Sequence, residues 1–192
     1  MVIRSYAQSM EDGIYPKGDL EGSVHVISKE SERLEQLVRK LLYLTKLDYV
    51  SAEPTQHQAF RLDQTARNVL EKLRWQRPEL IYDTGFAPVT VVGDEEQWTT
   101  AVENLLDNQI RYAKTRVTLR VEAPFSLLLG NNGPPLPSGM EEQAFSAFRS
   151  GPGGQFGLGL TIVKRIADLH QAKLHAHNTP EGVEFRIDFP AL

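Results

Sequence analysis

Hydrophobic residues recur at helical spacing over the first fifty positions of the chain. The pattern predicts one helix over 1–12, which the glycine and proline residues of 13–18 end, and a second helix over 20–49 that Asp19 can cap. In the second helix an apolar stripe is spaced by seven, three, four and three residues, which is typical of a coiled-coil seam. The stripe consists of Ile27, Leu34, Leu37, Leu41 and Leu44.

An apolar stripe of this kind has two interpretations. It can lie on the core of its own domain, or it can pair with a second copy of the chain. Residues 1–50 contain too little apolar material for a separate core, and this favours pairing. We therefore expect a two-helix hairpin over 1–50 through which the protein forms a homodimer.

The periodic pattern is lost over 51–57, and Pro54 in this stretch indicates a linker. From residue 58 to residue 192, strand-like and helix-like segments alternate, as in an α/β or α+β domain. A glycine- and proline-rich loop over 131–157 interrupts them, and such long loops inside compact domains are usually functional or disordered. The expected strands are 58–62, 79–83, 88–92, 115–122, 125–130, 172–178 and 182–189, and the expected helices are 63–76, 94–112 and 158–170.

The composition is that of a globular protein. The 192 residues include 21 Lys+Arg and 25 Asp+Glu, a net charge of −4, and 41% are hydrophobic. The acidic balance argues against nucleic acid as a partner, and the absence of cysteine excludes disulfides, zinc ribbons and thiol nucleophiles. No apolar run reaches the roughly 18 residues of a membrane span, and the start lacks the order of a signal peptide, so we expect a cytoplasmic chain.

The glycine cluster over 153–159 is the first candidate for chemistry, because it leads into a predicted helix. Glycines let backbone amides approach an anion where a helix N-terminus offers unpaired N–H groups, so a phosphate would fit there. The cluster matches neither a P-loop nor a dinucleotide-binding fingerprint. A mobile loop that enters a helix would explain it equally well.

The second candidate is the segment 103–112, in which Asn104, Asn108 and Arg111 recur at i, i+4 and i+7 and so share one helix face. Amide oxygens suit Mg²⁺, and an arginine one turn further on can pair with phosphate oxygens. A solvated polar face is the alternative interpretation.

The third candidate, 131–137, leaves a predicted strand with the sequence Asn-Asn-Gly-Pro. An asparagine at a strand end can hydrogen-bond the edge of a base. The same sequence is also ordinary turn chemistry.

Taken in order, these segments resemble the ATP-binding domain of sensor histidine kinases, part of a wider superfamily with the gyrase, Hsp90 and MutL ATPases. Residues 103–112 look like the family's N box, 131–137 its first glycine box, 145–148 its F box and 154–160 its second glycine box. Residues 1–50 are similar to its dimerisation and phosphotransfer hairpin. The resemblance implies an α+β fold of the Bergerat type, a two-layer sandwich whose mixed sheet is covered by helices on one face.

The resemblance also implies ATP and Mg²⁺ as ligands. Asn108 would bind Mg²⁺, and Asn104 would line the same site. Arg111 would contact phosphate, the Tyr112 ring would pack against adenine, and Asn131 would accept a hydrogen bond from the adenine amino group. The other implied ATP-binding residues are Gly133, Arg149, Gly157, Leu158, Gly159 and Leu160, beneath a mobile lid over 134–156 that Phe145 and Phe148 anchor.

Two positions depart from the family pattern. Asn131 stands where the family usually has an aspartate, and its amide can accept a hydrogen bond but carries no charge. Pro135 replaces the second glycine of the first glycine box, which fixes φ and removes a donor. Both departures predict weaker nucleotide binding on an unchanged fold.

The family's phosphoacceptor histidine would lie a few residues before Met1, so we expect it to be absent from this chain, which then holds no catalytic residue. None of the five histidines is an acceptor candidate: His25, His57, His170, His175 and His177. The pair His175 and His177 could share a strand face like metal ligands. A partly exposed strand face is the interpretation that we favour.

Three functions fit these residues. The chain can be the ATP-binding portion of a sensor histidine kinase, which transfers the γ-phosphoryl group of ATP to a histidine for relay to the receiver domain of a response regulator. Its parent protein would be anchored in a membrane by other segments, and this chain alone would not autophosphorylate. It can instead be a non-catalytic interaction module with a degenerate nucleotide site. A self-standing ATPase would need a glutamate where Asn104 stands.

Overall fold

The computed structural model describes residues 2–50, 57–137, 139, 141, 144–145 and 157–191. The chain forms two compact units, Met1–Tyr43 and Leu44–Leu192, which divide within the long helix α2. The predicted linker lies almost entirely outside the described residues. Our boundary after residue 50 therefore stays a prediction.

The first unit contains helix α1 (Val2–Glu11) and most of helix α2 (Leu20–Val50). The side chain of Asp19 accepts a hydrogen bond from the Gly22 backbone N–H, so the predicted cap of α2 is confirmed. No residue of α1 is buried, and the middle of α2 exposes large apolar side chains. These are Leu34, Val38, Leu41 and Leu42, which are between 41% and 66% exposed.

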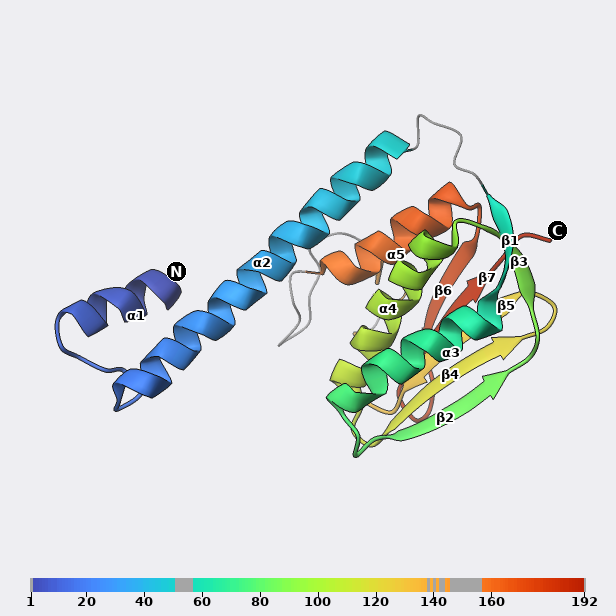
Figure 1. Ribbon diagram of the computed structural model, residues 1–192. Helices are drawn as coiled ribbons and strands as arrows, with labels where there is room; N and C mark the ends of the chain where they lie inside the picture. The colour runs from blue at the N-terminus through green and yellow to red at the C-terminus, as the bar shows by residue number, and fades with distance from the viewer. Residues whose placement is uncertain are drawn as a thin grey trace. The chain divides into compact units, whose positions relative to one another are not determined.

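The second unit is built on a five-stranded mixed sheet in the order β2-β4-β5-β7-β6 (Figure 1). Strand β2 pairs in parallel with β4, and all other neighbours in this sheet are antiparallel. Strands β1 and β3 form a separate antiparallel pair. The strands are β1 (Gln58–Arg61), β2 (Ile81–Phe86), β3 (Thr90–Gly93), β4 (Arg116–Glu122), β5 (Ser126–Asn131), β6 (Lys173–Asn178) and β7 (Val183–Asp188).

Helices α3 (Leu62–Leu73), α4 (Glu95–Tyr112) and α5 (Leu158–Leu169) cover one face of this sheet (Figure 1). The alternation along β4 shows why: Val117 and Leu119 are fully buried against the helices, while Arg116 and Arg120 are exposed on the opposite face. The predicted α+β fold with a helix-covered mixed sheet is therefore confirmed.

Several predicted boundaries were wrong by two or three residues. The helix expected over 63–76 ends at Leu73 and continues as a 3₁₀ turn over Arg74–Gln76. The strand expected over 79–83 instead spans Ile81–Phe86, because its parallel pairing with β4 sets both ends. The strand expected over 88–92 spans Thr90–Gly93, in register with β1. Pairing partners decide strand ends, and they are not visible in the local pattern.

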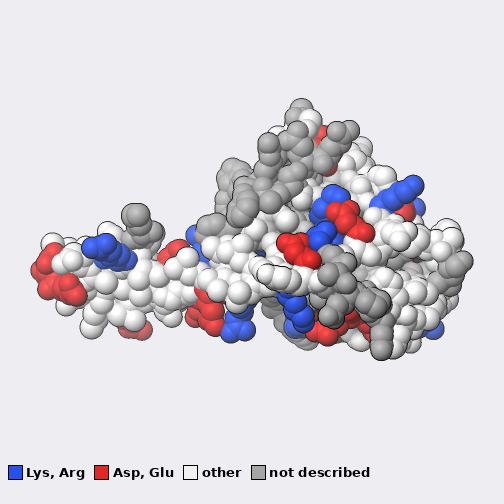
Figure 2. All heavy atoms as spheres, turned by 90° about the horizontal axis from the view of Figure 1, so that it is seen from above, with Lys and Arg blue, Asp and Glu red and all other residues white. Residues whose placement is uncertain are grey.

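Acidic and basic side chains are intermixed on the face of the molecule drawn in Figure 2, without a broad area of either sign. The net charge of −4 does not attract anions either, so an anionic ligand would depend on local groups. Among the helices of the described ranges, none is both long and apolar enough to cross a bilayer.

Candidate nucleotide-binding site

Helix α4 carries the candidate polar face. Asp94 caps it, since its Oδ1 accepts a hydrogen bond from the Gln97 backbone N–H at 3.0 Å. The apolar side of the helix is buried in the core, with Leu105 and Leu106 fully covered. The opposite side stays partly exposed and bears three of the predicted site residues, Asn104, Asn108 and Arg111.

These three side chains differ in their hydrogen-bond partners. Asn104 Nδ2 donates to the Thr100 carbonyl oxygen at 2.8 Å, which leaves its Oδ1 available. The Asn108 side chain makes no hydrogen bond with any residue that the structure describes. Arg111 Nη2 pairs with Asp107 Oδ2 at 2.7 Å, so a phosphate would have to share this guanidinium with a carboxylate.

Asn131 is the last residue of β5 and lies on the helix-covered face, where it is buried. Its Nδ2 donates to Gln109 Oε1 of α4 at 2.7 Å. Its Oδ1 accepts from the backbone N–H of Gly133 at 2.7 Å. The structure thus joins the first glycine box to the N-box helix through an amide pair.

Gly133 lies directly against the C-terminal end of α4. A Cβ atom at this position would overlap the carbonyl oxygen of Tyr112 and would lie 2.7 Å from Asn131 Oδ1. Only glycine permits this close approach. It brings Tyr112 and Asn131, which are far apart in the sequence, to one end of α4.

The entry to α5 has the geometry of an anion site. Gly157 adopts a left-handed conformation with φ of 63°, which favours glycine, and the helix begins at Leu158. The N–H groups of residues 158–160 have no partner within the helix. The Leu158 side chain is buried, so this residue could meet a phosphate only through its backbone.

His170 fixes the position of α5 relative to α4. Its Nε2 accepts a hydrogen bond from the Asp94 backbone N–H at 3.0 Å, so its Nδ1 bears the proton and donates to the Ile166 carbonyl oxygen at 2.8 Å. The C-terminal end of α5 thus meets the N-terminal end of α4, and the two helices pack on each other.

His170 is also a titratable side chain that is surrounded by protein rather than by water. It is buried, stacks on the ring of His57 with centroids 4.8 Å apart, and contacts Trp98 at 5.2 Å. Burial lowers the pKa of His170, and the neighbouring His57 lowers it further. The neutral imidazole is the form that both hydrogen bonds require.

Parts of the predicted lid are held on the sheet. Phe145 is buried and packs edge-on against Phe185 of β7, with ring centroids 5.7 Å apart. Asn178, at the end of β6, accepts from the Leu136 N–H at 2.7 Å and donates to the Leu136 carbonyl oxygen at 2.9 Å. Phe148 and Arg149 lie outside the described residues.

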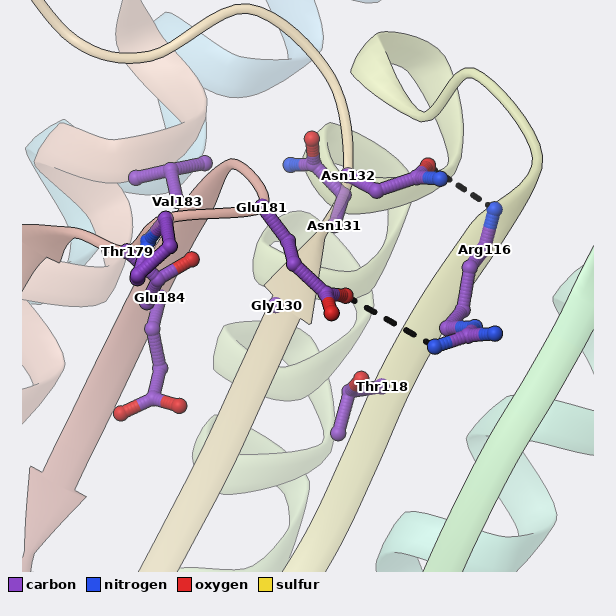
Figure 3. A pocket seen from close by; sticks show the side chains of 10 residues that line it. Arg116, Thr118, Gly130, Asn131, Asn132, Thr179, Glu181, Val183 and Glu184 are labelled. Carbon is purple, nitrogen blue, oxygen red and sulfur yellow. Dashed lines mark hydrogen bonds and ion pairs between the residues drawn. The ribbon is translucent and has the colours of Figure 1, made fainter.

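A hollow of about 320 Å³ lies on the opposite, open face of the sheet (Figure 3). Arg116 and Glu181 form an ion pair across it at 3.6 Å, and Thr118 and Glu184 line it. Of the predicted site residues only Asn131 borders it, and the side chain of Asn131 is directed to Gln109 on the other face. The other predicted site residues that the structure describes do not line this hollow.

The donor set fits Mg²⁺ and a triphosphate. Within the described ranges, no three His, Cys, Asp or Glu side chains gather as metal ligands. His175 and His177 instead face Asp188 and Glu184 on an exposed strand surface, at 3.5 and 3.2 Å. A hard cation here would take the Asn108 amide oxygen, phosphate oxygens and water, which is the usual coordination of Mg²⁺ beside a nucleotide.

Sequence reasoning missed three residues that organise this region: Gln109, His170 and Asn178. Gln109 had a visible signal, because a glutamine four residues after Leu105 interrupts the apolar side of α4. His170 and Asn178 had none, since their partners are distant in the sequence.

Residues 93–192, more than half of the chain, match the family described as histidine kinase-, DNA gyrase B- and HSP90-like ATPase. The chain therefore belongs to this family. The expected histidine kinase type of ATP-binding domain is confirmed.

The relatives are sensor kinases. Sensor histidine kinase CssS of Bacillus subtilis (strain 168) is 42% identical over 194 residues, which cover 99% of this chain and 43% of that protein. Probable sensor kinase SilS of Salmonella typhimurium is 26% identical over 91% of this chain and 38% of its own length. The chain thus spans less than half the length of these relatives.

Solved structures agree. The mycobacterial sensor histidine kinase MprB is 28% identical with a TM-score of 0.64, and the match covers 70% of this chain and 97% of that one. Histidine kinase AdeS of Acinetobacter baumannii has a TM-score of 0.79 over 98% of this chain and 92% of its own. At 20% identity, the likeness to AdeS shows the fold alone.

Proposed function

We propose that this chain binds Mg·ATP as the catalytic portion of a sensor histidine kinase. The observation that carries the proposal is that helix α4 contacts both glycine-rich segments. Its partly exposed face bears Asn108, its C-terminal end at Tyr112 meets the Gly133 turn, and α5, which begins after Gly157, packs on it. Base, metal and phosphate partners would then lie along one path.

In the reaction, an imidazole nitrogen of the acceptor histidine attacks the γ-phosphorus of ATP, and ADP leaves. The phosphoryl group then passes to an aspartate of a receiver domain. Arg111 and the backbone N–H groups at the start of α5 position the phosphates. The Asn108 amide oxygen would hold Mg²⁺, which would supply positive charge to the phosphates. We expect this chain to lie in the cytoplasm and to form a homodimer through residues 1–50. Other segments of the parent protein would anchor it in a membrane.

Titration with a fluorescent ATP analogue tests the proposal. We expect saturable binding to the wild-type chain in the presence of Mg²⁺, and a loss of affinity of about tenfold or more in Asn108→Ala, because metal-site groups typically contribute 10–100-fold. The matched control is Asn68→Ala, which removes an exposed asparagine from α3 and should leave binding unchanged.

The competing function, an interaction module with a degenerate nucleotide site, is favoured by the uncharged Asn131 and by Pro135. It predicts a folded protein without saturable binding even at millimolar nucleotide. That result, with a normal unfolding transition, would reject the kinase proposal.

A further inference from the structure

Gln109 is a fully buried polar side chain on the apolar side of α4. Its Nε2 donates to the Leu105 carbonyl oxygen at 3.3 Å, and its Oε1 accepts from Asn131 Nδ2 at 2.7 Å. Asn131 Oδ1 in turn accepts from the Gly133 N–H at 2.7 Å. Four groups therefore form one continuous chain of hydrogen bonds from the core of α4 to the first glycine box.

The direction of this chain is fixed at both ends. A backbone N–H such as that of Gly133 can only donate, and a backbone carbonyl such as that of Leu105 can only accept. Reversing either side-chain amide would set two donors or two acceptors against each other. Each mismatch leaves buried polar groups unsatisfied, which costs about 1–3 kcal/mol. The two amides therefore have one orientation.

This orientation decides what Asn131 offers a ligand. Its NH₂ group is turned toward Gln109, and its oxygen lies on the side of Gly133 with a second lone pair still available. Glycine at 133 adds no side chain beside this oxygen, since a Cβ there would lie 2.7 Å from it. A base beside Gly133 would meet an acceptor.

We propose that Gln109 is a positioning residue for base selection: it holds the Asn131 amide so that the site accepts a hydrogen bond from a 6-amino purine and disfavours a 6-oxo purine. The inference rests on the proposed ATP binding. With Gln109 beside it, the uncharged asparagine can act as an acceptor toward the base. A carboxylate would need no such neighbour, because both of its oxygens are acceptors.

The test compares the affinities of Mg·ATP and Mg·ITP, whose bases carry an amine and a carbonyl at position 6. Wild-type protein should prefer ATP. Gln109→Met keeps the volume but removes the acceptor for Asn131 Nδ2, so the Gly133 N–H alone still orients the amide and the NH₂ group can turn toward the base at the loss of one hydrogen bond instead of two. The ratio of ATP to ITP affinity should then fall by roughly tenfold.

The matched control is the same substitution in the Asn131→Asp background. Both oxygens of the carboxylate in that background can accept a hydrogen bond, so adding Gln109→Met to Asn131→Asp should leave the ratio unchanged. If Gln109→Met leaves the ratio of ATP to ITP affinity unchanged in both the wild type and Asn131→Asp, the proposal is overturned. An equal fall of this ratio in both proteins also overturns it, because Gln109 would then act through general packing.

A readout without nucleotide separates this inference from the proposed function. In the NMR spectrum of the free protein, the Asn131 side-chain NH₂ should exchange slowly with water, and Gln109→Met should accelerate the exchange. Fast exchange in the wild type refutes the hydrogen-bond chain even where ATP binds. Slow exchange without saturable binding of either nucleotide refutes ATP binding and, with it, the role of Gln109 in base selection.

Discussion

Gly133 has no room for a side chain, and this single position links two parts of the candidate site. The carbonyl oxygen of Tyr112 occupies the place that a Cβ would take, and Asn131 Oδ1 lies on its other side. A residue with any side chain would push the first glycine box away from α4. The packing of residues 131–133 against the end of α4 therefore requires glycine at position 133.

Gly133→Ala should separate the glycine box from α4. We expect a loss of about 1–3 kcal/mol in the free energy of unfolding, which is typical of overpacking, and a loss of affinity for Mg·ATP. Urea unfolding and nucleotide titration measure the two effects. The control is Gly85→Ala in β2, where the nearest atom to a new Cβ is a flexible arginine carbon at 3.6 Å. Equal effects of both substitutions would contradict this interpretation.

Helices α4 and α5 and strand β3 meet at His170. The imidazole accepts from the N–H of Asp94, which caps α4, and stacks on His57 near the start of β1. One ring thus holds the end of α5 against the start of α4. The packing of these two helices therefore depends on a neutral histidine.

Protonation of His170 should therefore weaken the fold. Its pKa is lowered in the folded state, so the unfolded chain binds more protons below the ordinary histidine pKa of about 6.5. Stability should be complete above that pH and fall as the pH decreases below it, by at most about 1.4 kcal/mol per pH unit from this group.

Urea unfolding between pH 8 and pH 5 measures this slope. His170→Gln should flatten it, whereas His175→Gln, which changes an exposed histidine of β6, should retain it. An unchanged slope in His170→Gln would assign the pH dependence to other groups, such as His57 or the carboxylates.

At the scale of the whole molecule, the two units have different surfaces. The second unit encloses a core in which Trp98 and Phe185 are almost fully buried. The first unit exposes Leu34, Val38 and Leu42, with side chains between 48% and 66% exposed. Apolar rows of this kind on a helix are stable when a second helix covers them.

We expect the wild-type chain to be a dimer in solution by light scattering. Leu41→Glu places a charge in the predicted seam and should produce monomers, because burying an unpaired carboxylate is costly. Ile81→Glu changes a similarly exposed residue in β2 and should leave the dimer intact. A wild-type monomer at high micromolar concentration, or dissociation by both substitutions, would refute pairing through the seam.

The sequence alone determined the order of elements and the class of fold. Helical spacing and the polar face of 103–112 are local properties, and both were readable because side chains on a helix repeat every three to four residues. The glycine cluster before the helix at 158 was equally local, but the left-handed conformation of Gly157 came only from the structure. The sequence also marked Asn131 as unusual.

Only the tertiary structure decided how these pieces act on one another. The amide of Asn131 acquires its orientation from Gln109, which is 22 residues away, and His170 reaches Asp94 across 76 residues. Strand ends such as Ile81 were set by pairing with β4. Such contacts depend on which faces pack together, and packing brings together residues whose separation along the chain carries no periodic signal.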